Sequence, residues 1–109
     1  YEAKYQDSNG AKMTISAEIP TDVSDRLRQI AIKAYKITCC EGMARVDFFL
    51  KNDNTFVVNE INTIPGFADA SMYPKLWIAS GVSYADLIAK LIGLAIDKYQ
   101  KNQELETTV

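Results

Sequence analysis

Apolar and polar positions follow two different periods along the chain, and each period predicts one kind of element. Over residues 12–19 the alternation has a period of two, which predicts a short, half-exposed strand. From residue 21 to about residue 38 the apolar positions recur every three or four residues, which is typical of a helix with one face on a core. Thr21 or Asp22 is expected to cap the start of this helix.

The middle of the chain predicts a β-hairpin. Met43–Lys51 is rich in apolar and aromatic residues, and Thr55–Glu60 is a second segment rich in Phe and Val. Asn52-Asp53-Asn54 lies between them and is typical of a tight turn. The two segments are therefore expected to pair in an antiparallel sheet.

The turn sets which residues of the hairpin face each other. If Asp53-Asn54 is the centre of the turn, Asp47 lies opposite Glu60, and Arg45 lies opposite Asn62. A loop with an even number of residues keeps the two carboxylates on one face of the sheet, whereas an odd number puts them on opposite faces.

The rest of the chain predicts a loop and two further helices. Residues 61–72 hold a Pro-Gly pair and are expected to form an irregular loop. A short helix over Tyr73–Ala79 is expected to stop at Gly81, and Ser83 is expected to cap a last helix. The polar tail over 102–109 is expected to fray.

Composition limits the fold and the function of the chain. Its 109 residues are 48% hydrophobic with only five Gly and three Pro, which fits one globular domain of the α+β class, an antiparallel sheet packed on helices. Folding at this size buries only about two-thirds of the surface of the unfolded chain, so a self-contained enzyme for several substrates is not expected. The chain begins at Tyr1 rather than Met, and we interpret it as a piece of a longer protein.

Charge and residue usage exclude several classes of function. Twelve basic and fourteen acidic residues are spread along the chain, so a nucleic-acid partner is not expected. No apolar stretch reaches the ~20 residues that span a membrane. The absence of histidine excludes a Ser-His-Asp triad and most zinc sites, and the adjacent Cys39 and Cys40 are expected to be free thiols in a reducing compartment.

The facing acids of the hairpin are the first candidate for chemistry. Two carboxylates about 5 Å apart repel each other unless a positive charge lies between them. Asp47, Glu60 and the amide oxygen of Asn62 are the kind of oxygen ligands that magnesium prefers, although a solvated polar face would have the same composition. Arg45 on that face could form a surface ion pair, or it could hold a phosphate beside the metal.

Two residues of the following loop have both a structural and a chemical interpretation. Gly66 offers an unshielded backbone N–H that could stabilise an oxyanion, but Pro-Gly is also a common turn. Ser71 precedes a short helix, where its hydroxyl could bind a carboxylate or could simply cap the helix.

Three motifs in order resemble the C-terminal part of D-alanine:D-alanine ligases, which belong to the ATP-grasp superfamily. They are Arg45-Val46-Asp47, then Asn59-Glu60-Ile61-Asn62-Thr63-Ile64-Pro65-Gly66-Phe67, then Ser71-Met72-Tyr73-Pro74-Lys75-Leu76. The opening Tyr1-Glu2-Ala3-Lys4-Tyr5 resembles the mobile loop that these ligases close over ATP. The likeness extends from Tyr1 to about Asp97. It implies the C-terminal subdomain of an ATP-grasp fold, with residues 1–10 as part of the mobile loop.

The resemblance implies an ATP-dependent ligation that forms D-alanyl-D-alanine for peptidoglycan synthesis, and thus for cell-wall biogenesis and cell shape. ATP would phosphorylate the carboxylate of one D-alanine, and the amine of a second would attack the acyl phosphate. Asp47, Glu60 and Asn62 would hold two magnesium ions, for which manganese could substitute, with Glu60 touching both. Lys4 would reach the γ-phosphate of ATP.

The remaining roles concern the reacting groups and the second substrate. Arg45 and the N–H of Gly66 would stabilise the acyl phosphate and the tetrahedral oxyanion, and Tyr5 would help to latch the mobile loop. Ser71 and Met72 would bind the carboxylate of the second D-alanine.

The resemblance also implies partners and limits. The N-terminal and central domains of the family have no counterpart in these 109 residues, so the chain alone is expected to be inactive. The full-length protein would be a cytoplasmic homodimer. Two other functions stay open: a ligase that uses D-lactate or D-serine as the second substrate, and a non-catalytic module that binds a divalent cation through its carboxylates.

Overall fold

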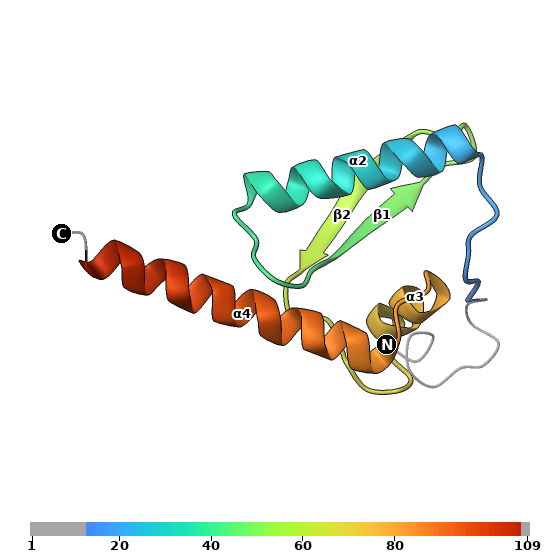
Figure 1. The fold of residues 1–109 in the computed structure, drawn as a ribbon. Coiled ribbons are helices and arrows are strands. Elements are labelled where there is room, and N and C mark those ends of the chain that lie inside the picture. Colours follow the sequence, from blue (N-terminus) through green and yellow to red (C-terminus); the bar gives the residue numbers. More distant parts are fainter. Residues whose placement is uncertain (1–12, 108–109) are drawn as a thin grey trace.

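The computed structural model of the chain describes residues 13–107 and has the expected α+β composition (Figure 1). The elements follow in the order helix, two strands, helix, helix. They are α2 (Thr21–Ile37), β1 (Arg45–Leu50), β2 (Phe56–Asn62), α3 (Met72–Ala79) and α4 (Tyr84–Thr107). The two strands form one antiparallel sheet, as the hairpin pattern predicts.

The first packing layer consists of α2 lying across one face of the hairpin (Figure 1). Val23 of α2 is only 1% exposed. On the sheet, the rings of Phe48 and Phe56 meet edge to face with centroids 5.8 Å apart, and the guanidinium of Arg26 lies 5.6 Å above the Phe56 ring. Apolar burial and this cation–π contact therefore fix which face of the hairpin α2 covers.

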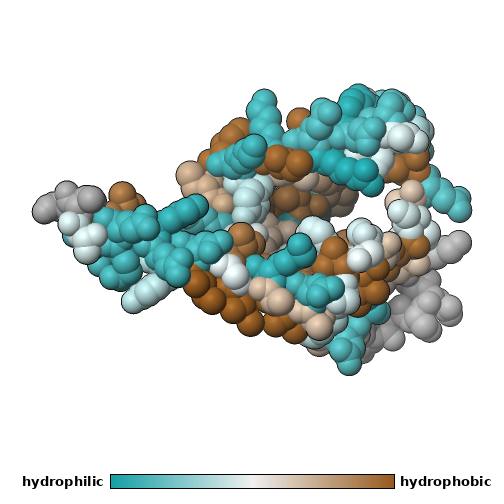
Figure 2. Space-filling view, viewed as in Figure 1, coloured by the Kyte–Doolittle hydropathy of each residue, from teal (hydrophilic) through white to brown (hydrophobic). Residues whose placement is uncertain are grey.

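The second layer is formed by α3, α4 and the loop before them. Tyr73 and Pro74 of α3 and Leu87 of α4 are buried there. The two helices meet at 108°, and the C-terminal half of α4 projects from the body of the molecule (Figure 1). Figure 2 shows the molecule hollowed between the two layers, with apolar side chains at the surface along α4.

The hairpin has the predicted pairing of Asp47 with Glu60, but its loop is longer than the two-residue turn assumed for it. The N–H of Lys51 donates to the carbonyl of Thr55 at 2.8 Å, so the loop has three residues rather than two, and Asn54 takes the left-handed conformation that such a loop needs (φ 63°). The predicted turn over Asn52-Asp53-Asn54 is therefore confirmed, but Asp53-Asn54 alone is not its centre. An odd loop alone would have separated Asp47 from Glu60.

A β-bulge compensates for the odd loop. Phe48 pairs with Val58, and the next pair is Asp47 with Glu60, so Asn59 is an extra residue in β2. The bulge shifts the register by one, and the two carboxylates face each other as predicted. Arg45 likewise pairs with Asn62.

Two predictions about the start of the described region are wrong. Residues 13–20 form no strand; backbone hydrogen bonds of a strand need a neighbour, and the described sheet has only β1 and β2. Pro20 occupies the N-cap of α2 without a side-chain cap, because Thr21 and Asp22 already lie inside the helix. The helix α4 continues to Thr107, and the fraying expected over 102–109 stays a prediction.

Two end signals are confirmed. The hydroxyl of Ser83 accepts a hydrogen bond from the N–H of Asp86 at 3.1 Å, which is an N-cap of α4. Gly81 follows α3 with φ 91°, a conformation that glycine adopts easily and other residues do not.

Two glycine-to-alanine substitutions should change stability in opposite directions. Gly93 lies inside α4, where an added methyl group would meet open space, so Gly93→Ala should stabilise the chain by about 0.5–1 kcal/mol. Gly81→Ala should destabilise it by about 1 kcal/mol, because φ 91° is strained for alanine. Thermal unfolding of the 109-residue chain checks both signs. Equal changes of the melting temperature in the two variants would contradict both the end of α3 at Ala79 and the position of Gly93 inside a helix.

No single helix in residues 13–107 is long and apolar enough to cross a membrane. Only α3 and α4 taken together reach the necessary length and composition, and they are bent by 108° where they meet.

Candidate functional site

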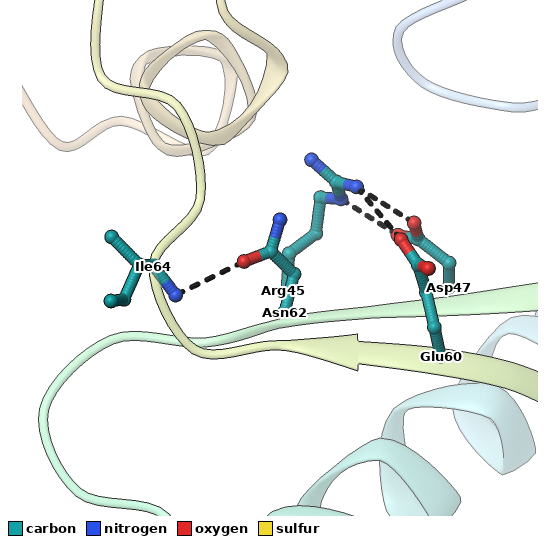
Figure 3. A network of polar contacts seen from close by, with 5 residues as sticks. All are labelled: Arg45, Asp47, Glu60, Asn62 and Ile64. Atoms are coloured by element: carbon teal, nitrogen blue, oxygen red, sulfur yellow. Dashed lines mark hydrogen bonds and ion pairs between the residues drawn. The ribbon is translucent and has the colours of Figure 1, made fainter.

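Four polar side chains gather on the hairpin face that points away from α2 (Figure 3). They are Arg45 and Asp47 of β1 and Glu60 and Asn62 of β2, which we call the hairpin polar cluster. The strand pairs Arg45–Asn62 and Asp47–Glu60 place all four on one face. The sequence prediction that these four residues come together is therefore confirmed.

Arg45 holds the two carboxylates together. Its Nε lies 2.8 Å from Oδ1 of Asp47 and its Nη2 lies 2.8 Å from Oδ2, which is a two-pronged pair. The same Nη2 lies 3.6 Å from Oε1 of Glu60 (Figure 3). The side chains of Arg45 and Asp47 are 27% and 32% exposed, so solvent screens this pair less than an open surface pair.

Asn62 links the cluster to the loop that follows β2. Its Oδ1 accepts a hydrogen bond from the N–H of Ile64 at 3.0 Å, which fixes the first turn of loop 63–71 (Figure 3). An amide oxygen has a second lone pair, so this bond leaves one position for another ligand. The last residue of β2 thus both shapes the loop and offers an oxygen to the cluster.

The cluster provides oxygen ligands for a hard divalent cation that would also bind water or substrate. In residues 13–107 no three Asp, Glu, Cys or His side chains converge. Two carboxylates and one amide oxygen fit magnesium, which keeps waters and takes substrate phosphates as further ligands. The guanidinium of Arg45 hydrogen-bonds to Asp47 and forms a longer ion pair with Glu60, so the cluster already holds one positive charge.

Gly66 and Ser71 meet in loop 63–71. A Cβ placed on Gly66 would lie 2.9 Å from Oγ of Ser71 and 3.4 Å from its Cβ, so a larger residue there would force the serine or the loop to move. Ser71 stands at the N-cap of α3, yet its hydroxyl makes no capping hydrogen bond. The simple interpretation of Ser71 as a cap is therefore wrong, and the hydroxyl lies next to the backbone of Gly66.

The other predicted residues lie at the start of α3 or outside the described region. Met72 is the first residue of α3, directly after Ser71. Lys4 and Tyr5 lie outside residues 13–107. Cys39 and Cys40 are free thiols, as predicted.

A cavity of about 620 Å³ lies away from the hairpin polar cluster. It is formed by the turn after α2 and by α4, and its walls include Tyr35, Cys40, Leu91 and Leu94. No member of the hairpin polar cluster lines it. Its walls also carry the carboxylates of Glu41 and Asp97 and the amide of Asn102, and Glu41 is paired with Lys98. We favour the cluster as the candidate site because there two carboxylates face each other on paired strands beside a guanidinium.

Comparison with known families decides the relationship of the chain. Residues 1–93 match the family described as "D-ala D-ala ligase C-terminus", which is most of the chain. The chain belongs to this family. The resemblance inferred from the three sequence motifs is therefore confirmed.

Curated relatives match this family member along its whole length. The D-alanine–D-alanine ligase A of Salmonella typhimurium is 55% identical over all 109 residues, and that of Escherichia coli K12 is 50% identical over the same length. The ligase of Shouchella clausii is 54% identical. The chain spans 30% of the length of each of these proteins.

Solved structures of ligases share its fold. The D-alanine–D-alanine ligase of Coxiella burnetii has a TM-score of 0.87 at 49% identity and covers 92% of this chain, which covers 29% of that protein. The ligase of Bacillus anthracis complexed with ATP has a TM-score of 0.72 at 30% identity, with 78% and 30% covered. The predicted α+β, ATP-grasp type of fold is confirmed by these neighbours.

Asn59 is the site feature that the sequence prediction missed. The apolar residues of β2 that face α2 are Phe56, Val58 and Ile61, and the step from 58 to 61 is one residue too long for a regular strand. This odd spacing signals a bulge. Read with the three-residue loop, it would have given the observed pairing.

Proposed function

We propose that the chain is the C-terminal part of the ATP-grasp domain of a D-alanine:D-alanine ligase. The observation that carries the proposal is the hairpin polar cluster, because in a member of this family it joins metal ligands and a guanidinium on one face. Loop 63–71, in which Ser71 lies beside Gly66, continues directly from the cluster through Asn62. We call the full-length protein that contains this chain the complete ligase.

The cluster would hold the metal ions and phosphates. Asp47, Glu60 and Asn62 are the proposed ligands of two magnesium ions, with Glu60 shared, and manganese is a possible substitute. Bound magnesium would neutralise the charge of the ATP phosphates during phosphoryl transfer. Lys4 would pair with the γ-phosphate.

The reaction would proceed in two steps. The carboxylate of one D-alanine attacks the γ-phosphorus of ATP, which releases ADP and forms an acyl phosphate. The amine of the second D-alanine then attacks the acyl carbon, loses a proton and expels inorganic phosphate. Arg45 would hold the transferred phosphate with its guanidinium fork, and the N–H of Gly66 would stabilise the oxyanion.

The acceptor and the covering loop would complete the site. Ser71 would donate its hydroxyl to the carboxylate of the second D-alanine, which its missing capping bond supports. Met72 would bind the same carboxylate through its backbone N–H at the start of α3, and the positive end of the helix favours a negative charge there. Tyr5 would latch the mobile loop over ATP.

The remaining domains would cover apolar surface that this chain leaves open. Apart from Pro65 and Pro74, the buried apolar side chains in residues 13–107 are Val23, Tyr73 and Leu87, while Ile64 is 81% exposed. Such exposure supports contacts with further parts of the same enzyme. We propose a single domain over 1–109, N-terminal and central domains as its partners, a homodimer as the full-length form, and a cytoplasmic location with a role in cell-wall synthesis.

An isotope experiment tests the proposed reaction. The complete ligase is supplied with ATP, magnesium and D-alanine labelled with ¹⁸O in the carboxylate, and the phosphate and dipeptide are analysed by mass spectrometry. Transfer of one ¹⁸O to inorganic phosphate, together with D-alanyl-D-alanine, is expected. Unlabelled phosphate would contradict an acyl phosphate, and a preference for D-lactate or D-serine over D-alanine as acceptor would contradict the proposed product.

The isolated 109-residue chain should release no phosphate in the same assay. A malachite-green measurement with ATP, magnesium and D-alanine tests this, and turnover by the chain alone would contradict the need for further domains. Calorimetry on the complete ligase gives a second test. A metal affinity that is the same with and without ATP analogues would favour a structural cation-binding module instead.

Arg45 should compete with the metal for the carboxylates. Its guanidinium bonds to Asp47 and lies near Glu60, so Arg45→Gln removes the positive charge that a metal must displace. We expect manganese to bind the variant about ten-fold more tightly than the wild-type complete ligase when ATP is absent, as measured by electron paramagnetic resonance. Weaker binding by the variant would show that Arg45 does not occupy the metal position.

A further inference from the structure

Loop 63–71 is fixed to the two following helices by an aromatic cluster. The hydroxyl of Tyr84, the first residue of α4, donates to the carbonyl of Phe67 at 2.9 Å. The Phe67 ring lies between two others, with centroids 5.4 Å from Tyr84 and 5.8 Å from Tyr73. Tyr73 is 7% exposed and contacts Trp77, so the cluster rests on the buried side of α3.

This attachment acts directly on Gly66. Glycine has more backbone freedom than any other residue, so the direction of its N–H depends on what fixes its neighbours. On one side Pro65 is buried, and its ring fixes its own φ angle. On the other side Phe67 is held by the ring contacts and by the Tyr84 hydrogen bond.

Tyr84 is itself held in place by regular structure, so it can hold Phe67 in place. It begins a helix of 24 residues whose N-terminus is capped by Ser83, so its backbone is anchored by regular structure. The ring supplies packing and the hydroxyl supplies the hydrogen bond, and only the second depends on its being tyrosine rather than phenylalanine.

We propose that Tyr84 is a positioning residue for the acceptor side of the site: its hydroxyl fixes the Phe67 carbonyl and thereby sets the backbone of Gly66 and the adjacent hydroxyl of Ser71. This rests on the proposed function. Tyr84 touches no reacting atom in this role. Its loss should affect the second D-alanine, which meets Gly66 and Ser71, and spare ATP and the metal, which meet the hairpin polar cluster.

The test compares two tyrosine-to-phenylalanine variants of the complete ligase. Tyr84→Phe removes the hydroxyl and keeps the ring. Tyr35→Phe is the matched control, because the Tyr35 hydroxyl donates to a loop carbonyl, that of Gly42, at 3.0 Å and far along the chain from loop 63–71. Burial, with smaller effects of Cys40, Glu41 and Tyr73, raises the pKa of Tyr35, so the Tyr35 hydroxyl stays protonated at neutral pH.

We expect Tyr84→Phe to lower kcat/KM for the second D-alanine about ten-fold, since one hydrogen bond and a small displacement of the oxyanion donor are lost. The KM for ATP and the affinity for manganese should stay unchanged, and hydrogen exchange in loop 63–71 should become faster. Tyr35→Phe should leave all four quantities unchanged.

Two results would overturn the role of Tyr84 while leaving the proposed function intact: unchanged acceptor kinetics in Tyr84→Phe, or an equal loss for ATP and for the acceptor. If the wild-type complete ligase binds ATP and manganese but makes no dipeptide, the proposed function itself fails, and the role of Tyr84 falls with it.

Discussion

Glu60→Gln should lower kcat of the complete ligase by about 10³-fold, the largest effect expected from any substitution in this chain. Glu60 faces Asp47 across the hairpin and is the proposed shared ligand of both metal ions. Glutamine keeps the shape and one oxygen but removes the negative charge, so the charge of the transferred phosphate is no longer offset. Steady-state kinetics at saturating ATP and D-alanine, with manganese titrations, give both the rate and the metal affinity.

Asp53→Asn is the matched control for this loss of charge. Asp53 lies in the loop of the same hairpin, where its carboxylate accepts hydrogen bonds from the hydroxyl and the N–H of Thr55, at 2.6 Å and 3.0 Å, which lower its pKa. Asparagine keeps an acceptor oxygen, so activity should change less than two-fold. Loss of activity in Asp53→Asn comparable to that in Glu60→Gln would contradict a role specific to the cluster.

Gly66→Ala should lower kcat/KM for the second D-alanine by about 10²-fold. The new methyl group would lie 2.9 Å from Oγ of Ser71, closer than side-chain carbons come to other atoms, so either the loop or Ser71 must move. Both residues are proposed to meet the acceptor, and displacing one oxyanion donor costs about 10²–10³-fold in rate. Initial rates at varied D-alanine concentration measure the effect.

Gly93→Ala is the control for Gly66→Ala, because open space surrounds the added methyl group in α4. It should leave the kinetics unchanged while stabilising the protein. Wild-type kinetics in Gly66→Ala would show that loop 63–71 adapts freely, which would contradict both its proposed chemistry and its attachment through Phe67.

The sequence predicted the elements well where one local signal dominated. The three- and four-residue periodicity of α2, the cap at Ser83 and the stop at Gly81 are all seen in the structure. Residues 13–19 alternate like a strand but lack a strand to pair with among residues 13–107, because pairing depends on distant segments and not on the local pattern.

The sequence predicted which residues of the hairpin polar cluster face each other, but not the turn and bulge that bring them together. The pairing of Asp47 with Glu60 depends on an odd loop and on a bulge at Asn59, two irregularities that cancel. The contact of Gly66 with Ser71 depends on how a loop folds back, which no period of apolar residues encodes. The fork of Arg45 on Asp47 is a choice of rotamer that sequence spacing leaves open.

The central claim is that this chain supplies the metal- and acceptor-binding part of a D-alanine:D-alanine ligase. The most direct measurement replaces the matching 30% of the Salmonella typhimurium enzyme, 55% identical over all 109 residues, with this chain and assays D-alanyl-D-alanine formation. We predict dipeptide formation within about ten-fold of the parent enzyme, and its loss when Glu60→Gln is introduced. A folded chimera that binds ATP and manganese but forms no dipeptide would contradict the claim.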